Sequence, residues 1–101
     1  MSNDSATTHA VVQTDRPDRY GKQLVSHLGR RNGGEWSPES RSGWIDLGSG
    51  RATVSARDGE LELTVTAPAD ELARLQDVVG SHLVRFGERD ELTVAWDGAA
   101  D

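Results

Sequence analysis

Cysteine is absent from the 101-residue sequence. This absence excludes a disulfide scaffold, a thiolate zinc site and a cysteine nucleophile, and it agrees with a reducing compartment. No apolar run approaches the roughly 20 residues that a helix needs to cross a bilayer. The first eight residues also lack the basic and apolar segments of a signal peptide. We therefore expect a cytoplasmic protein that is not embedded in a membrane.

Several motifs of catalysis and cofactor binding are missing as well. The sequence has no G-x-S-x-G nucleophile elbow. Gly48-Ser49-Gly50 precedes neither a helical pattern nor a Lys-Ser or Lys-Thr pair, so it predicts a turn rather than a phosphate loop. Glu60 and Glu62 alternate along a strand in the manner of solvated side chains, which is weak support for a paired acid and base. We therefore predict no catalytic residue, no metal ligand and no cofactor.

Positive charge is scarce, because 11 Lys and Arg residues face 17 Asp and Glu residues and leave a net charge of -6. Such a composition disfavours nucleic-acid binding, which depends on clustered positive charge. Residues 15–31 are an exception, since five basic side chains there accompany two acidic ones. This basic segment suits an acidic protein partner or a small anionic ligand. A solvated helix face explains the same pattern.

Apolar periodicity predicts two helices. In the first, Tyr20, Leu24 and Leu28 are spaced by four; Asp15 precedes this helix as the expected N-cap, and it ends near Arg31. The second helix follows Pro68 and is expected to be capped near Asp70. Its broad apolar stripe contains Leu72, Leu75, Val79, Leu83 and Phe86.

Short runs between and around the helices predict strands at 9–14, 35–37, 43–47, 51–57, 60–67 and 92–96. Strict alternation in 51–57 and 60–67, joined by Asp58-Gly59, is typical of a β-hairpin with one covered face. The economical arrangement is an α+β two-layer sandwich, a mostly antiparallel sheet with two helices on one face, in the order β-α-β-β-β-β-α-β. We expect one domain over residues 8–97, a disordered tail at 1–7 and a second tail at 98–101.

A short internal echo marks the two helices. Ser26-His27-Leu28-Gly29-Arg30 returns as Ser81-His82-Leu83-Val84-Arg85, so each helix carries one histidine beside its apolar stripe. Such an imidazole is a candidate metal ligand, general base or pH switch, or a structural histidine that hydrogen-bonds a neighbour. For antiparallel helices of equal length the two histidines would lie about 12 Å apart along the axis, too far for one metal ion. Parallel or steeply crossing helices would remove that objection.

The arginines that follow these histidines are the second set of candidates. Arg30 and Arg85 come three residues after the histidines, where a cation also stabilises the end of a helix. The functional alternative is that the basic residues around the first histidine, Lys22, Arg30 and Arg31, bind a carboxylate or phosphate. We therefore treat His27, His82, Arg30, Arg85 and Lys22 as candidate ligand-binding residues.

Three tryptophans are many for this length. Trp36 lies in a weak strand, and Trp44 has the opposite phase to Ile45. Exposed tryptophans often mark a contact surface, so Trp36 and Trp44 are candidate interface residues of a homodimer. The alternative is that they pack against each other and a loop. Trp96 is in phase with its apolar neighbours and is expected in the core.

Two longer segments resemble a known family. They are Arg19-Tyr20-Gly21-Lys22-Gln23-Leu24-Val25-Ser26-His27 and His82-Leu83-Val84-Arg85-Phe86-Gly87-Glu88-Arg89-Asp90-Glu91-Leu92, with Trp96 closing the last strand. Together they resemble the bacterial domain-of-unknown-function family DUF2218. Its members are small proteins, and the domain resembles one appended to siderophore-interacting flavin reductases. The resemblance implies a loose link to iron acquisition and supplies no catalytic or ligand residues.

These observations lead to two hypotheses. The first is a small non-enzymatic binding or accessory module that forms a homodimer and, through the resemblance, takes part in iron or siderophore metabolism. The alternative is a metal- or haem-dependent site, or an acid-base enzyme, that uses His27 and His82. The alternative requires both imidazoles to open onto one cavity.

Overall fold

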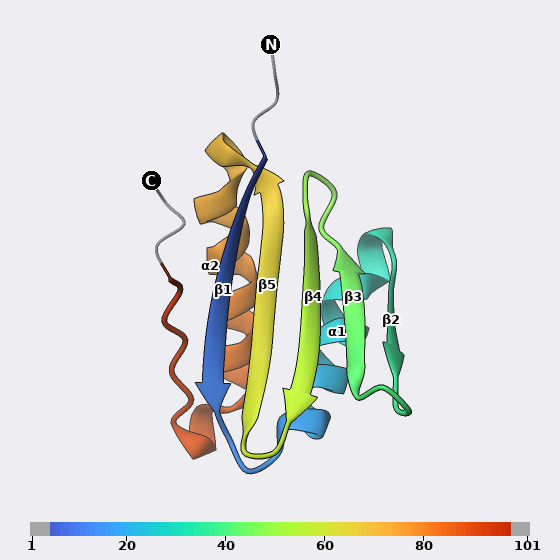
Figure 1. Ribbon diagram of the computed structural model, residues 1–101, viewed down its shortest axis with the longest axis vertical. Coiled ribbons are helices and arrows are strands. Elements are labelled where there is room, and N and C mark those ends of the chain that lie inside the picture. Colours follow the sequence, from blue (N-terminus) through green and yellow to red (C-terminus); the bar gives the residue numbers. More distant parts are fainter. Residues whose placement is uncertain (1–4, 98–101) are drawn as a thin grey trace.

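Residues 5–97 of the computed structural model form a five-stranded antiparallel sheet with two helices on one face (Figure 1). The strands lie in the order β1-β5-β4-β3-β2. This arrangement confirms the predicted α+β fold class. The elements are β1 (Ser5–Gln13), α1 (Pro17–Asn32), β2 (Gly34–Ser37), β3 (Ser42–Asp46), β4 (Arg51–Arg57), β5 (Glu60–Pro68), α2 (Ala69–Phe86) and the short 3-10 helix η1 (Glu88–Asp90).

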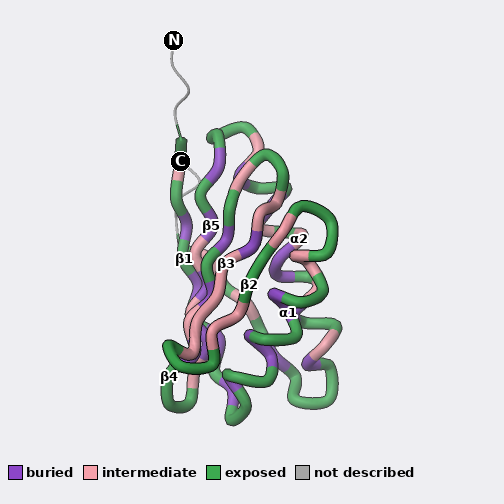
Figure 2. Tube along the Cα trace, turned by 90° about the vertical axis from the view of Figure 1, so that its right-hand side faces the viewer, coloured by how far each residue is buried: buried purple, intermediate pink, exposed green. Residues whose placement is uncertain are grey.

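The core lies between the sheet and the helices. Alternate residues of β4 and β5 are buried, as their pattern predicts, and the intervening residues face the open side of the sheet. In the side view of Figure 2, the buried positions lie where the strands face the helices. Helix α1 covers β2, β3 and β4, whereas α2 covers β5 and β1. Each helix therefore covers one half of the sheet, and the two helices contact each other over the middle of the sheet.

The turn between β4 and β5 forms as predicted. Arg57 pairs with Glu60 across the Asp58-Gly59 turn. Gly59 has a φ of 79°, in the left-handed region that glycine adopts without steric cost. This local hairpin fixes which residues of the two central strands face the helices.

The beginnings of three elements differ from the predictions. Strand β1 starts at Ser5, so residues 5–7, expected in the disordered tail, pair with the end of β5. Neither helix has a side-chain N-cap, so the predictions for Asp15 and Asp70 are wrong. Instead, Pro17 opens α1, and α2 follows Pro68 directly. The remaining tail residues, 1–4 and 98–101, lie outside the described residues.

The predicted last strand at 92–96 is also wrong, because this segment makes a single bridge between Trp96 and Ala10 of β1. Next to this bridge, the Asp97 carboxylate accepts a hydrogen bond from the His9 backbone amide at 3.1 Å. The Asp97 backbone amide donates to the His9 carbonyl at 2.8 Å.

Over the described part of the chain, neither helix is both long and apolar enough to cross a membrane.

Candidate functional site

The two histidines of the echo are in contact. The centroids of the His27 and His82 rings lie 5.1 Å apart, with an angle of 42° between the ring planes. The expected separation of about 12 Å along the axis is therefore wrong. Helices α1 and α2 run in opposite directions (Figure 1), which is one of the arrangements that the sequence left open, but the expectation of about 12 Å for this arrangement assumed helices of equal length with level ends. Because the two rings are in contact, the ends of the two helices are not level.

Both rings line one cleft of about 400 Å³ between α1, α2 and the end of β3. The end of α1 contributes Arg30, Arg31 and Asn32 to this helix-helix cleft, and α2 contributes Arg74. Its floor contains the apolar side chains of Leu28, Leu47 and Leu75. A cleft of this volume falls within the usual range for small-molecule sites.

The orientation of the His82 ring is set by its own helix. Its Nδ1 lies 2.7 Å from the backbone carbonyl oxygen of Val78. A carbonyl only accepts, so Nδ1 must carry the proton and donate it. This bond leaves Nε2 of a neutral ring with a free lone pair. Phe86 also packs edge-on against both imidazoles, with centroid distances of 5.4 Å to His27 and 6.4 Å to His82.

The helix-helix cleft is rich in positive charge. Within residues 5–97, Arg30 and Arg31 have no ion-pair partner. Arg74 is already bound, because its guanidinium donates to Glu71 at 2.7 Å and to Ser49 at 3.0 Å. The one carboxylate that lines the cleft, Asp46, accepts a hydrogen bond from the Gly48 amide at 2.9 Å. The two unpaired guanidinium groups are therefore the groups most available to an anion.

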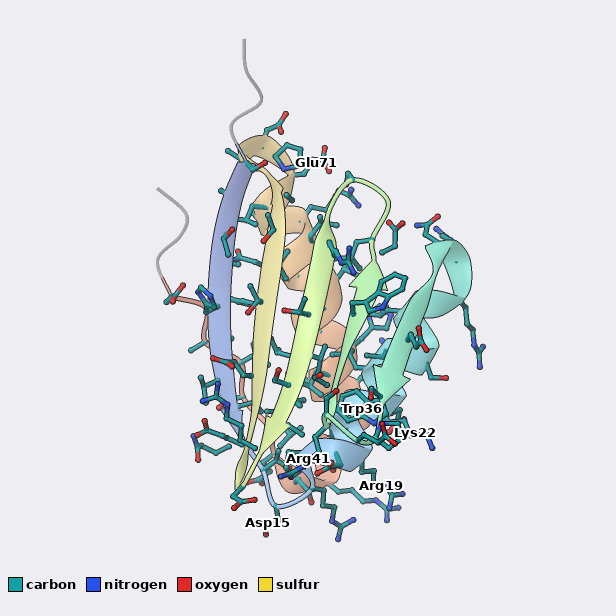
Figure 3. The ribbon with its side chains drawn as sticks, turned by 45° about the vertical axis from the view of Figure 1, so that its right-hand side comes forward. Asp15, Arg19, Lys22, Trp36, Arg41 and Glu71 are labelled. Atoms are coloured by element: carbon teal, nitrogen blue, oxygen red, sulfur yellow. The ribbon has the colours of Figure 1, made fainter. Side chains whose placement is uncertain are left out.

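The other predicted ligand residues lie elsewhere. Arg85 lines a different groove, on the side of α2 that faces Val94 and Trp96. Figure 3 shows Arg19 and Lys22 toward the lower end of the molecule, far from Glu71, the partner of Arg74, at the upper end. The fold thus brings His27, His82 and Arg30 together and leaves Lys22 and Arg85 outside their cleft.

Arg74 was not among the candidates, although the sequence contains a signal for it. It lies eight residues before His82, about two helical turns, and so occupies the same side of α2. Arg19 has the same spacing to His27 but points to the opposite end of the molecule, because the helices are antiparallel (Figure 3).

The tryptophans separate onto the two faces of the sheet. Trp36 packs under α1, where a Cβ added to Gly21 would lie only 2.8 Å from its ring. Trp44 is on the open face, where the Arg51 guanidinium lies 4.7 Å from its ring centroid. Mutual packing of Trp36 and Trp44 is therefore wrong, and of the two only Trp44 faces outward. Trp96 is partly buried at the margin of the core.

Comparison with known proteins yields a family and a fold. Residues 9–97 match the model of DUF2218, described as an uncharacterised protein conserved in bacteria. The chain is also similar to the NMR structure of PA4090 from Pseudomonas aeruginosa, with 30% sequence identity and a TM-score of 0.75. That match covers 95% of this chain and 99% of the other. No curated protein matches the sequence.

Proposed function

Since the chain belongs to DUF2218, a bacterial family of uncharacterised proteins, we propose its function from the helix-helix cleft itself. The protein is a binding module that holds a small anionic ligand between α1 and α2. The observation that carries this proposal is the convergence of two guanidinium groups, which have no ion-pair partner within residues 5–97, with two imidazoles in one cleft.

The chemistry of the cleft favours a carboxylate or phosphate ligand. The planar guanidinium groups of Arg30 and Arg31 offer paired N–H donors that match either anion. The apolar floor formed by Leu28, Leu47 and Leu75 can cover the carbon skeleton of such a ligand. Because both arginines are exposed, we expect affinity to fall as salt increases. These arginines also stabilise the end of α1, a role that is compatible with binding.

The test is an NMR titration of the full chain with citrate at low ionic strength. We expect the largest shifts at the end of α1 and around His82. The double variant Arg30→Gln/Arg31→Gln should weaken binding about tenfold or more, the loss expected for a charge-assisted contact. Arg85→Gln is the matched control, because it removes the equivalent arginine of the echo outside the cleft. Equal affinity for the double variant and the control would refute the proposal.

A role in iron or siderophore metabolism remains a proposal that depends on the family likeness. The cleft supports it only in general terms, because deprotonated iron chelators are small anions of the type proposed here. The titration should therefore be repeated with a ferric hydroxycarboxylate complex. A place in the cytoplasm likewise stays a prediction.

The homodimer also stays a prediction, and Trp44 is now its main support. Its ring is partly exposed on the open face of the sheet, whereas Trp36 is engaged under α1. Sedimentation velocity over a wide concentration range tests it directly. A dimer that persists in Trp44→Ser would show that this face is not the interface.

A further inference from the structure

We propose that His27 and His82 jointly coordinate a divalent transition-metal ion that reaches the cleft as a complex with an anionic chelate. This inference rests on the proposed function, because the arginines that bind a free anion would bind the carboxylates of the chelate. It adds a specific role for the histidine pair and a chemical class for the ligand.

The spacing of the two rings fits coordination of one ion. A metal–nitrogen bond of about 2.1 Å, together with the imidazole radius, places the ion roughly 3.2 Å from each ring centroid. Two imidazoles at adjacent positions of an octahedral or tetrahedral ion then have centroids about 4.5 to 5.2 Å apart. The observed distance between the His27 and His82 centroids is 5.1 Å. The distance between the rings is therefore compatible with one shared ion once a nitrogen of each ring faces it.

The hydrogen bonding of His82 also suits a ligand. Histidines that bind metals usually donate their second ring N–H to a carbonyl or carboxylate, which orients the ring and fixes the tautomer. His82 donates its Nδ1–H to the Val78 carbonyl, and Nε2 is the nitrogen left for a metal. No side-chain hydrogen bond engages His27 among the described residues, so neither of its ring nitrogens is committed to another side chain, although the ring packs against Phe86.

A bare ion would lack both ligands and charge balance. Among residues 5–97, no third His, Cys, Asp or Glu side chain completes a metal-binding group. The nearby guanidinium groups of Arg30, Arg31 and Arg74 would also repel a free dication. A polycarboxylate chelate removes both problems, since it supplies the missing oxygen or nitrogen ligands and the negative charge. A tetradentate chelate leaves two adjacent positions of an octahedral ion for two imidazoles.

The experiment uses tag-free full-length protein and the Ni²⁺ complex of nitrilotriacetate, which has two open positions. Isothermal titration calorimetry should give a stoichiometry of one complex per chain. His27→Ala and His82→Ala should each weaken binding at least tenfold. The matched control is His9→Ala, since His9 is the third histidine of the chain and lies on the open face of β1. Far-ultraviolet circular dichroism verifies that each variant is folded.

Opposite effects on two probes then separate the metal site from the anion site. Arg30→Gln/Arg31→Gln should weaken binding of the anionic nickel chelate, but it should leave binding of Ni²⁺ alone unchanged or tighter. If His9→Ala weakens chelate binding as much as His27→Ala, or if all variants bind equally, the inference is wrong. If the chelate does not bind while citrate binds through the arginines, the inference fails and the proposed function stands. If binding needs the histidines but not the arginines, the anion site fails.

Discussion

The two helices carry the same short motif, yet they are held to the sheet in different ways. Helix α2 buries a continuous apolar stripe, formed by Leu72, Leu75, Val79 and Leu83. Helix α1 has fewer large apolar residues in the core, chiefly Tyr20, Leu24 and Val25. Its first turns are held by polar side chains instead. Helix α2 is therefore held to the sheet mainly by apolar burial, whereas the beginning of α1 depends also on directional polar contacts.

The polar contacts of α1 lie at its beginning. Asp18 accepts hydrogen bonds from Arg41 at 2.7 Å and 3.0 Å, and Arg41 also reaches Asp58 at 3.4 Å. Two turns that are distant in sequence are thereby tied to α1 at the lower end of the molecule, where Figure 3 shows Arg41. Two residues further along α1, the Tyr20 hydroxyl donates to Asp90 of η1 at 2.5 Å. These contacts connect the start of α1 to the segment that follows α2.

The largest expected difference between the helices concerns the leucines at equivalent positions of the echo. Leu83 of α2 is fully buried, whereas Leu28 of α1 is only partly buried. We expect Leu83→Ala to lower the free energy of unfolding by about 2 to 5 kcal/mol, and Leu28→Ala by roughly half as much. Urea unfolding followed by tryptophan fluorescence measures both values. Equal losses would mean that burial does not distinguish the two helices.

An intermediate effect is expected from the phenol of Tyr20. Tyr20→Phe removes its hydrogen bond to Asp90 and should lower the free energy of unfolding by about 1 to 2 kcal/mol. That hydrogen bond, followed by burial, raises the pKa of Tyr20 above its ordinary value. The stabilisation is therefore complete below about pH 10, the pKa of an unfolded tyrosine, and is lost as pH rises toward the higher folded value.

The measurement for Tyr20 is urea unfolding of both proteins from neutral to alkaline pH. The stability difference between the native chain and Tyr20→Phe should be constant near neutrality and shrink above about pH 10. A difference that does not change with pH would show that the hydrogen bond to Asp90 does not stabilise the folded chain.

The fold was predictable because its signals are local. Alternation in β4 and β5 follows directly from the geometry of a strand, and Asp58-Gly59 supplies the turn residues that a hairpin requires. The same local reasoning failed at the last strand. There the segment 92–96 makes only the bridge between Trp96 and Ala10, and the neighbouring Asp97 bonds His9 at a distance of 88 residues along the chain. No periodicity in the sequence contains that information.

The site was predictable only in part, for a related reason. Spacing within a helix placed His27 and His82 on the faces that meet, but it gives no information on the offset between two helices. The expected separation was therefore wrong, although the two histidines do line one cleft. Lys22 and Arg85 lie outside this cleft, since closeness to the motif in sequence does not bring a residue into it. Only the relative placement of α1 and α2 separates Arg30 from Arg85.

The smallest expected effect concerns the charged contact at the start of α1. Asp18 and Arg41 are both substantially exposed, so Asp18→Asn should cost about 0.5 to 1 kcal/mol. The hydrogen bond from Arg41 is the main cause that lowers the pKa of Asp18. Its stabilisation is thus present above about pH 4, the pKa of an unfolded aspartate, and is lost as pH falls through the lower folded value.

Urea unfolding across the acidic range tests this contact, with Arg41→Lys as the matched control that keeps the charge but not the planar donor pair. The native chain should lose stability faster than Asp18→Asn as pH falls below about 4. Arg41→Lys should retain only part of the difference, because an ammonium cannot form the two parallel, coplanar hydrogen bonds that the guanidinium makes to Asp18. If Arg41→Lys retains all of it, charge rather than donor geometry carries the contact between Asp18 and Arg41.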